Sequence, residues 1–399
     1  MNIILITVGE NISVLEKDVS MIRGLLKNNV KVFPFHFSYN IDYFHSFINN
    51  YKIYDFNWNF VEVLFKGSTK IEKLLNNMKL SLSFYLKLKT LIKQYKIDAI
   101  IVPCECITEI LCTLKIFSKI NNIPIIAHIV EYRPSLPGYN YNIRKKIRWK
   151  FLVKFADAYI VISKWLMNKL SIYKKPLFYL PIIFDPSMVD IIVDKIRNIS
   201  DIKIINMFSQ KPVLIYSSSS NYVDLLEFSL KALSFLKDQD FLLVITGNYT
   251  EEQKKYWQSI IKTLNLENKV IFSGYLKEKE FFTLMKNSTA LLIPLLNNVQ
   301  HQARFPQKIL DYIYLEKPII STKVGEIGEH FIDGETAFLD DTITPQGYSK
   351  KIEFVLKNPN KAEIVAKNAK KYILTNFYYL KCTKDLKSFI DKICSENIF

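Results

Sequence analysis

Three charged residues in one short stretch could together bind a phosphorylated ligand. The stretch reads Arg304-Phe305-Pro306-Gln307-Lys308-Ile309-Leu310-Asp311-Tyr312. Pro306 is typical of the first turn of a helix, and Lys308 and Asp311, three residues apart, share one side of that helix. A helix start offers unpaired N–H groups and a positive dipole end. A cationic helix start with a carboxylate one turn along therefore suits a phosphate next to a sugar hydroxyl, as in a nucleotide; the alternative is a solvated helix start with a Lys308–Asp311 pair.

Small residues that follow predicted strands could line the same nucleotide site. Ser217, Ser218 and Ser219 follow the apolar run 212–216, and small residues there let backbone N–H groups approach a phosphate. Gly274 and Tyr275 end a second apolar run, where a nucleotide base could stack on the ring or pair with the backbone.

Other candidate residues also lie just beyond predicted strands. Glu329, beyond Gly325, is a candidate ligand contact, and Gly9 ends the run 2–8 in a tight turn. His128 and Glu131 follow a buried strand and could orient a ligand hydroxyl, the work of a general acid or base. For His128 the alternative is a structural histidine at a strand end.

Alternation of strands and helices indicates the elements that hold these residues. Apolar runs of about five residues, typical of buried parallel strands, alternate with amphipathic helical segments. The strands are predicted at 2–8, 30–35, 99–103, 124–128, 158–162, 212–216, 241–246, 270–272, 290–294 and 318–322. This rhythm predicts α/β domains with doubly wound parallel sheets. For 36–65 we predict no regular structure, and for 70–96 a long basic helix.

The alternation is interrupted once, at a segment with two prolines, Leu180 to Pro186. We therefore predict a first domain at 1–180, a linker at 181–210 and a second domain at 211–375. A last helix, 376–399, has the first domain as a candidate packing partner. Ligands of such sheets bind outside the carboxyl ends of the strands, so we expect the active site in a cleft between two domains.

The composition excludes several classes of protein. Apolar residues make up 49% of the 399, which suffices for two cores and argues against disorder. The net charge of +16 favours anionic partners, but the lysines are dispersed rather than gathered in a nucleic-acid-binding motif, so we expect no nucleic acid. A solvated lysine-rich surface and an anionic membrane surface are the two remaining explanations.

Cysteine and hydrophobic patterns predict a cytoplasmic protein. The five cysteines are odd in number and lack metal-ligand spacing, which favours free thiols and no metal. Residues 2–8 lack the basic start and cleavage site of a signal peptide, and no run is long enough to span a bilayer. The segment 142–154 alternates six cations with Ile147, Trp149, Phe151 and Leu152. It is either an interfacial helix at the inner membrane face or a core helix with a basic outer side.

The stretch 304–312 and the residues around it resemble a known family. Arg304-Phe305-Pro306-x-Lys308-x-x-Asp311-Tyr312, Lys317-Pro318-Ile319-Ile320-Ser321 and Asp333-Gly334 are similar to motifs of the retaining glycosyltransferases of family 4, also called glycosyl transferases group 1. Tyr216-Ser217-Ser218-Ser219 and Ser273-Gly274-Tyr275 match in order. The likeness covers nearly the whole chain and is strongest over 212–340.

The resemblance implies a GT-B fold, a nucleoside-diphosphate-sugar donor, retention of anomeric configuration, and no metal or other cofactor. It places Asp311 where the family has the second glutamate of a pair spaced eight apart. The first glutamate's position holds Ala303, and the basic pair usual after the first strand of the second domain is absent from 217–221. Arg304 and Lys308 are the candidate replacements for that pair.

We therefore predict a retaining glycosyltransferase that acts on a cell-envelope glycan of lipopolysaccharide, capsule or exopolysaccharide type. Its acceptor would be a glycan or a lipid-linked glycan. Ala303 and the missing basic pair keep a second hypothesis open, a catalytically silent GT-B subunit that binds a partner enzyme or glycan. A nucleotide-sugar epimerase with the same two-domain plan is a third.

Overall fold

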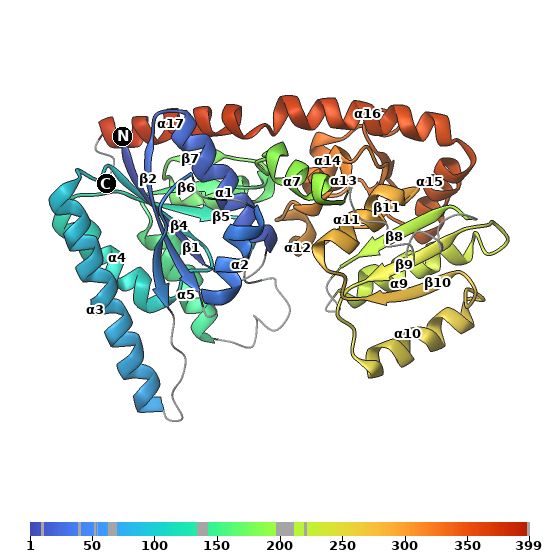
Figure 1. Cartoon of the computed structure of the whole chain (residues 1–399), viewed down its shortest axis with the longest axis horizontal. Coiled ribbons are helices and arrows are strands. Elements are labelled where there is room, and N and C mark those ends of the chain that lie inside the picture. The colour runs from blue at the N-terminus through green and yellow to red at the C-terminus, as the bar shows by residue number, and fades with distance from the viewer. Residues whose placement is uncertain are drawn as a thin grey trace. The chain divides into compact units, whose positions relative to one another are not determined.

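The chain forms two compact units. The computed structural model describes residues 1–8, 12–38, 41–51, 53, 55–62, 70–132, 134, 143–196, 211–218 and 222–396. The first unit comprises Met1–Asp185, Ala303–Phe305 and Asn376–Phe399, and the second comprises Pro186–Gln302 and Pro306–Thr375 (Figure 1). The chain therefore passes from one unit to the other four times.

The first unit is built on a seven-stranded parallel sheet. Its strands are β1 (Asn2–Val8), β2 (Lys31–Ser38), β3 (Asn59–Glu62), β4 (Ala99–Pro103), β5 (Ile125–Ile129), β6 (Ala158–Val161) and β7 (Leu177–Tyr179). They are ordered β3-β2-β1-β4-β5-β6-β7, and every neighbouring pair is parallel. Strands β1, β4, β5 and β6 are buried almost throughout because helices cover both faces.

Two helices from opposite ends of the sequence cover one face of this sheet. Helix α1 (Ile12–Lys27) packs beside α17 (Tyr379–Glu396), as Figure 1 shows. Met21 and Leu25 of α1 share a buried cluster with Leu386 and Ile390 of α17. The remaining helices of this unit are α2 (Ile41–Tyr51), α3 (Lys70–Gln94), α4 (Thr108–Asn121), α5 (Ile143–Phe155) and α6 (Lys164–Leu170).

The second unit repeats the plan with six strands. They are β8 (Val213–Ser217), β9 (Leu242–Thr246), β10 (Val270–Gly274), β11 (Ala290–Ile293), β12 (Ile319–Thr322) and β13 (Phe338–Asp340). All neighbours are parallel in the order β10-β9-β8-β11-β12-β13. The order reverses between β8 and β11, so these two strands form the topological switch point where ligands of such sheets bind.

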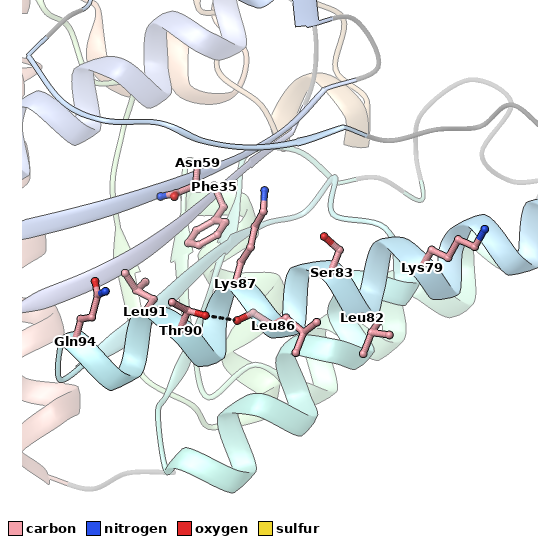
Figure 2. A pocket seen from close by; sticks show the side chains of 10 residues that line it. All are labelled: Phe35, Asn59, Lys79, Leu82, Ser83, Leu86, Lys87, Thr90, Leu91 and Gln94. Carbon is pink, nitrogen blue, oxygen red and sulfur yellow. Dashed lines mark hydrogen bonds between the residues drawn. The ribbon is translucent and has the colours of Figure 1, made fainter.

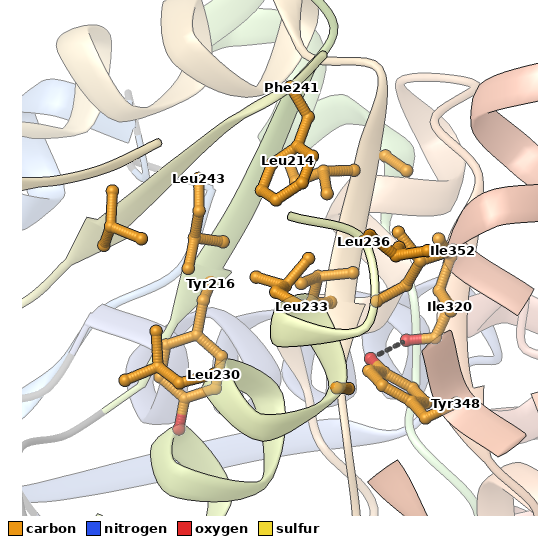
Figure 3. Packing of buried hydrophobic residues seen from close by; sticks show 14 of the residues in the cluster. Leu214, Tyr216, Leu230, Leu233, Leu236, Phe241, Leu243, Ile320, Tyr348 and Ile352 are labelled. Carbon is orange, nitrogen blue, oxygen red and sulfur yellow. Dashed lines mark hydrogen bonds between the residues drawn. The ribbon is translucent and has the colours of Figure 1, made fainter. Parts of the chain in front are cut away.

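Side chains of the second sheet and of the helices that cover it form one core. Leu214, Leu243 and Ile320 of the strands pack against Leu230 and Leu233 of α9 (Val223–Ser234) (Figure 3). In the same view the Tyr348 hydroxyl of α15 (Pro345–Lys357) donates a 2.8 Å hydrogen bond to the Ile320 carbonyl oxygen. Other helices are α7 (Pro186–Ile196), α10 (Glu251–Thr263), α11 (Glu278–Asn287), α12 (Val299–Gln302), α13 (Lys308–Tyr314), α14 (Gly325–His330) and α16 (Pro359–Asn376).

Two stretches differ from their sequence-based expectations. The range 36–65, for which we predicted no regular structure, holds the end of β2, helix α2 and strand β3. The range 181–210, expected to be a linker, begins with an extended segment and contains α7, which starts at Pro186; residues 197–210 lie outside the described part of the chain. Proline at the first helical position starts a helix as readily as it interrupts one, which explains the second difference.

Within the described part of the chain, no helix is long and apolar enough to cross a membrane.

Candidate functional site

The carboxyl ends of three neighbouring strands in the second unit are held together by backbone contacts. The Gly247 N–H, just after β9, donates to the Gly274 carbonyl at the end of β10 over 3.1 Å. Gly247 has a φ of 140°, and a Cβ there would lie 2.7 Å from the Ser218 carbonyl oxygen beyond β8. Only glycine permits that approach, so Gly247 fixes how closely the β8 and β9 ends meet.

Ser217 and Lys308 join the two sides of the switch point. Ser217 is the last residue of β8, and Lys308 is the first of α13, in the connection after β11. The Lys308 Nζ donates to the Ser217 Oγ over 3.3 Å and lies 5.4 Å from the centre of the Phe281 ring of α11. A cation–π contact of this kind orients an ammonium group, so the Lys308 Nζ is held at the end of the central strand.

Helix α13 begins two residues later than predicted. We predicted a helix that opens at Pro306, whereas Pro306 and Gln307 form a turn that precedes the helix. In that turn the Ile309 and Leu310 N–H groups bond to the Pro306 and Gln307 carbonyls at 3.3 and 3.2 Å. Ile309, Leu310 and Ile313 are buried, as the apolar spacing predicted, and their burial turns Lys308 outward.

A pair of half-buried carboxyl groups lies beside Lys308. Burial raises the pKa of Asp311, the Lys308 ammonium opposes the rise, and the charge of Glu278 adds to it. Burial likewise raises the pKa of Glu278, at the start of α11, to about 7. Two acids that disfavour each other's ionisation therefore share the space near one cation.

The Tyr312 phenol completes this cluster on its buried side. Burial raises its pKa strongly, while the nearby Ser217 side chain acts in the opposite direction. Ser217 thus interacts with both Lys308 and Tyr312. The resulting cluster, which we call the switch-point cluster, consists of Ser217, Glu278, Lys308, Asp311 and Tyr312.

Three further predicted residues lie on connections of the second unit. Gly274 has a φ of 74°, a left-handed conformation that favours glycine, and open space where a Cβ would be. Tyr275 next to it is 68% exposed. Ser218 is half-buried, and Ser219 lies outside the described residues.

Glu329 and Glu326 differ sharply in their surroundings. Glu329 is exposed on α14, whereas Glu326 is buried and lies 3.5 Å from the His330 Nε2. Gly325, which starts α14, has a φ of 54°, and a Cβ there would meet the His301 carbonyl at 2.7 Å. Gly325 therefore allows α14 to approach the end of α12.

Arg304 lies in the first unit, together with Ala303 and Phe305. The Ser163 hydroxyl donates to the Ala303 carbonyl over 3.1 Å, and the Phe305 ring packs edge-on against Phe377 at 5.7 Å. These contacts hold the three residues against the first unit.

The predicted acceptor-side residues also lie in the first unit. His128 is on β5 and buried, and burial with the nearby Lys17 charge lowers its pKa to about 3. His128 is therefore neutral at physiological pH. Glu131 follows the strand and is half-buried, and Gly9 lies outside the described residues.

Two buried charged residues near His128 were not predicted from the sequence. Lys17 and Asp18 lie on α1, and both are buried. Burial raises the pKa of Asp18 to about 7, and Glu105, which follows β4, acts in the same direction. Lys17 and Glu105 act on His128 as well, so the end of β5 faces a group of charges drawn from α1 and the β4 connection.

The segment 142–154 forms α5 from Ile143 onward. Trp149, Leu152 and Val153 are buried, whereas Ile143 and Ile147 are exposed. Most of its apolar side chains thus face the core, as the core-helix alternative required; Asn142 lies outside the described residues. Among the side chains that the structure describes, no group of three or more His, Cys, Asp and Glu could hold a metal ion.

The second unit matches a known family. The model of the glycosyl transferases group 1 matches residues 198–372, a range that includes the whole switch-point cluster. Residues 198–372 are therefore similar to this family. The resemblance noted in the sequence motifs is thereby confirmed for the range in which it was strongest.

Curated relatives match parts of the chain. A 2-deoxystreptamine N-acetyl-D-glucosaminyltransferase of Niallia circulans is 25% identical over 138 residues, which cover 35% of this chain and 34% of that protein. A trehalose synthase of Thermococcus litoralis is 21% identical over 264 residues, 62% of this chain and 60% of that protein. The matches thus span about a third and three-fifths of those relatives' lengths.

Solved structures match over the whole length. HepE of Anabaena, crystallised with UDP and glucose, superposes with a TM-score of 0.67 at 14% identity, covering 98% of this chain and 100% of that one. At this identity the likeness shows the fold, which is GT-B. The predicted fold class, two Rossmann-like units with parallel sheets, is confirmed.

The sequence analysis predicted Lys308, Asp311 and Ser217 of the switch-point cluster. It predicted neither Glu278 of that cluster nor Gly247, which lies outside it. Glu278 reads in the sequence as an ordinary acid at a helix start. Gly247 carried a usable signal, because it directly follows the apolar run 241–246 just as Gly274 follows its own strand.

Proposed function

We propose that the protein is a retaining glycosyltransferase that moves one sugar from a nucleoside-diphosphate sugar to a cell-envelope glycan. The observation that carries this proposal is the contact between Lys308 and Ser217 across the switch point of the second sheet, with Asp311 one helical turn further on. A cation at the end of the central strand suits a diphosphate, and a carboxyl group beside it suits a ribose diol.

Each residue of the site has a stated role in this proposal. Lys308 stabilises the negative charge that develops on the departing diphosphate, and Arg304 supplies a second cation. The backbone of Ser217 and Ser218 approaches the phosphates, as Gly247 allows. Asp311 accepts hydrogen bonds from the ribose, Gly274 and the exposed Tyr275 receive the base, and Glu329 contacts the donor sugar. The donor serves as substrate, and no cofactor is required.

The first unit supplies the acceptor side. Glu131, half-buried just beyond β5, orients the acceptor hydroxyl. His128 positions the strand end rather than accepting a proton, because burial holds its pKa near 3. The departing phosphate takes the acceptor proton.

The acceptor is a glycan of the lipopolysaccharide, capsule or exopolysaccharide type, free or linked to a lipid. The enzyme then acts in the cytoplasm, peripherally at the inner membrane face. The excess of 54 basic over 38 acidic residues supports an anionic surface as partner. A role of α5 in docking has less support, since Trp149 and Leu152 are buried.

The direct experiment is calorimetry with a panel of nucleotide sugars, followed by an assay for donor hydrolysis. We expect one nucleoside-diphosphate sugar to bind, and Lys308→Ala combined with Asp311→Ala to abolish binding. Thermal unfolding of the double variant controls for misfolding. Binding that survives in a folded double variant would exclude the site.

Two alternatives have distinct signatures. A silent GT-B subunit, suggested by Ala303 in place of a glutamate, would bind a glycan or partner and turn over no donor. An epimerase would yield product without any added acceptor. Transfer that requires both donor and acceptor excludes both.

A further inference from the structure

Helix α3 carries a stripe of large apolar side chains on its exposed side. Leu75, Met78, Leu82 and Leu86 follow one another at three or four residues and so share one side of the helix. Their side chains are between 50% and 61% exposed. A contiguous apolar stripe on an outer helix is a mark of an interaction surface.

The stripe is separate from the side of α3 that stabilises the first unit. Phe84 and Leu88 are fully buried, and the Phe84 ring packs edge-on against Phe35 and Phe37 of β2 at 5.5 and 5.1 Å. The exposed leucines therefore contribute little to the core, and a function outside the core is needed to explain them.

Lysines continue and flank the stripe. The spacing of three or four residues runs on from Leu86 to Lys89 and Lys93, and Lys79 lies beside Leu82; all three lysines are exposed. The sequence of α3 contains six lysines and a single acid, Glu72. An apolar stripe bordered by cations is complementary to a surface that is apolar below and anionic above.

A groove runs beside this helix. It has a volume of about 660 Å³ and is lined by α3, by Phe35 of β2 and by Asn59 of β3. Figure 2 shows Lys87 extending from α3 toward Phe35 and Asn59, and Leu82 and Leu86 of the stripe also line the groove. The groove and the apolar stripe therefore share residues of one helix.

We propose that the exposed side of α3 docks the protein on an anionic lipid bilayer. Leu75, Met78, Leu82 and Leu86 enter the boundary between headgroups and acyl chains, and Lys79, Lys89 and Lys93 bind the lipid phosphates. Long lysine stems allow this because they lie along apolar surface while the charge stays in water. The proposal places docking on α3 rather than α5, and it does not depend on the donor chemistry of the second unit.

The test is co-sedimentation of the whole protein with vesicles. One set contains phosphatidylcholine alone and the other phosphatidylcholine with phosphatidylglycerol. We expect binding to the anionic vesicles only. Replacing Lys79, Lys89 and Lys93 by Gln should lower the partition coefficient on the order of a hundredfold, from roughly fivefold per lysine. Replacing the four apolar residues of the stripe by Gln should lower it at least as much.

Control variants in the second unit test whether vesicle binding depends on where the lysines and apolar residues lie, and not only on how many there are. Lys255, Lys262 and Lys286 are exposed lysines of the second unit, and their replacement by Gln removes the same charge. Phe235, Ile332 and Ile364 are exposed apolar residues of that unit and provide the apolar control. Both control variants should bind vesicles like the wild type.

Three outcomes would overturn the proposal: equal binding to neutral vesicles, α3 variants that bind like the wild type, and control variants that lose as much. Absence of vesicle binding together with self-association lost in the stripe variant would make the face an interface between copies. Thermal unfolding and nucleotide-sugar binding of the same variants, both expected to be unchanged, distinguish failed docking from a failed transferase.

Discussion

The Lys308 ammonium group lies 3.3 Å from the Ser217 hydroxyl, although 91 positions separate the two residues in the sequence. The contact exists because β8 and β11 are neighbours in the second sheet: Ser217 ends β8, and the connection after β11 brings Lys308 to the same edge.

Lys308→Met should weaken donor use more than any other single change in the switch-point cluster. Loss of one preorganised charge contact costs about 2.7–4 kcal/mol of barrier, or on the order of 10²–10³ in kcat. Steady-state kinetics with the identified donor measures the effect. Lys262→Met on α10 removes an equally exposed lysine and should leave kcat unchanged; a similar loss in both variants would contradict a local role of Lys308.

Donor binding should depend on pH through Asp311. Its carboxyl group accepts ribose hydrogen bonds best when ionised, so affinity should rise as pH increases through its raised pKa. Glu278→Gln removes a neighbouring negative charge and should move the midpoint to lower pH, while Lys308→Met should move it to higher pH. Calorimetric titration across pH 5 to 9 tests this, with pH-independent binding expected of Asp311→Asn; shifts of the opposite sign would refute the arrangement.

Glu278→Gln should stabilise the unliganded protein at alkaline pH. A carboxyl group whose folded pKa is raised to about 7 costs no stability below the ordinary pKa near 4, and the cost grows as pH rises to 7. The gain should be about 1–3 kcal/mol at pH 8 and near zero at pH 4. Urea unfolding at the two pH values measures it, with the exposed Glu280→Gln as control. A gain of equal size at pH 4 would mean that burial of the charge is not its cause.

Gly247→Ala and Gly274→Ala should differ although both glycines have positive φ. At Gly274 the added methyl group meets open space, so only the backbone conformation is disfavoured, by about 1 kcal/mol. At Gly247 the methyl group would also meet the Ser218 carbonyl at 2.7 Å, which displaces the Ser218 backbone. Thermal unfolding should show the larger loss for Gly247→Ala, accompanied by weaker donor binding; equal effects would argue against the close approach.

The fold was largely predictable because buried parallel strands leave a simple pattern. Asn2–Val8 and Ala99–Pro103 read as strands and are strands with unchanged bounds. In 36–65 the pattern fails, because α2 intersperses aromatic residues with polar ones and β3 is a strand of only four residues at the sheet edge. Short edge strands lack the continuous apolar run that burial on both faces produces.

The candidate site was predictable only where its residues are close in sequence. Lys308 and Asp311 share a helix, so their spacing alone placed them together. Glu278 reaches Asp311 from α11, whose Phe281 ring lies beside Tyr312 of α13, and Lys17 reaches His128 from α1. Such pairings depend on the burial and neighbours of each group, which periodicity does not encode.

The return of α17 to the first unit has a consequence for how the protein is made. The core under α1 lacks Leu386, Ile390 and Ile393 until the ribosome has synthesised them, so the part of the chain that emerges first is completed last. Apolar surface on α1 and β1 therefore stays exposed while the entire second unit is synthesised. A nascent chain in that condition is a substrate for holding chaperones, and expression at reduced temperature should favour its recovery.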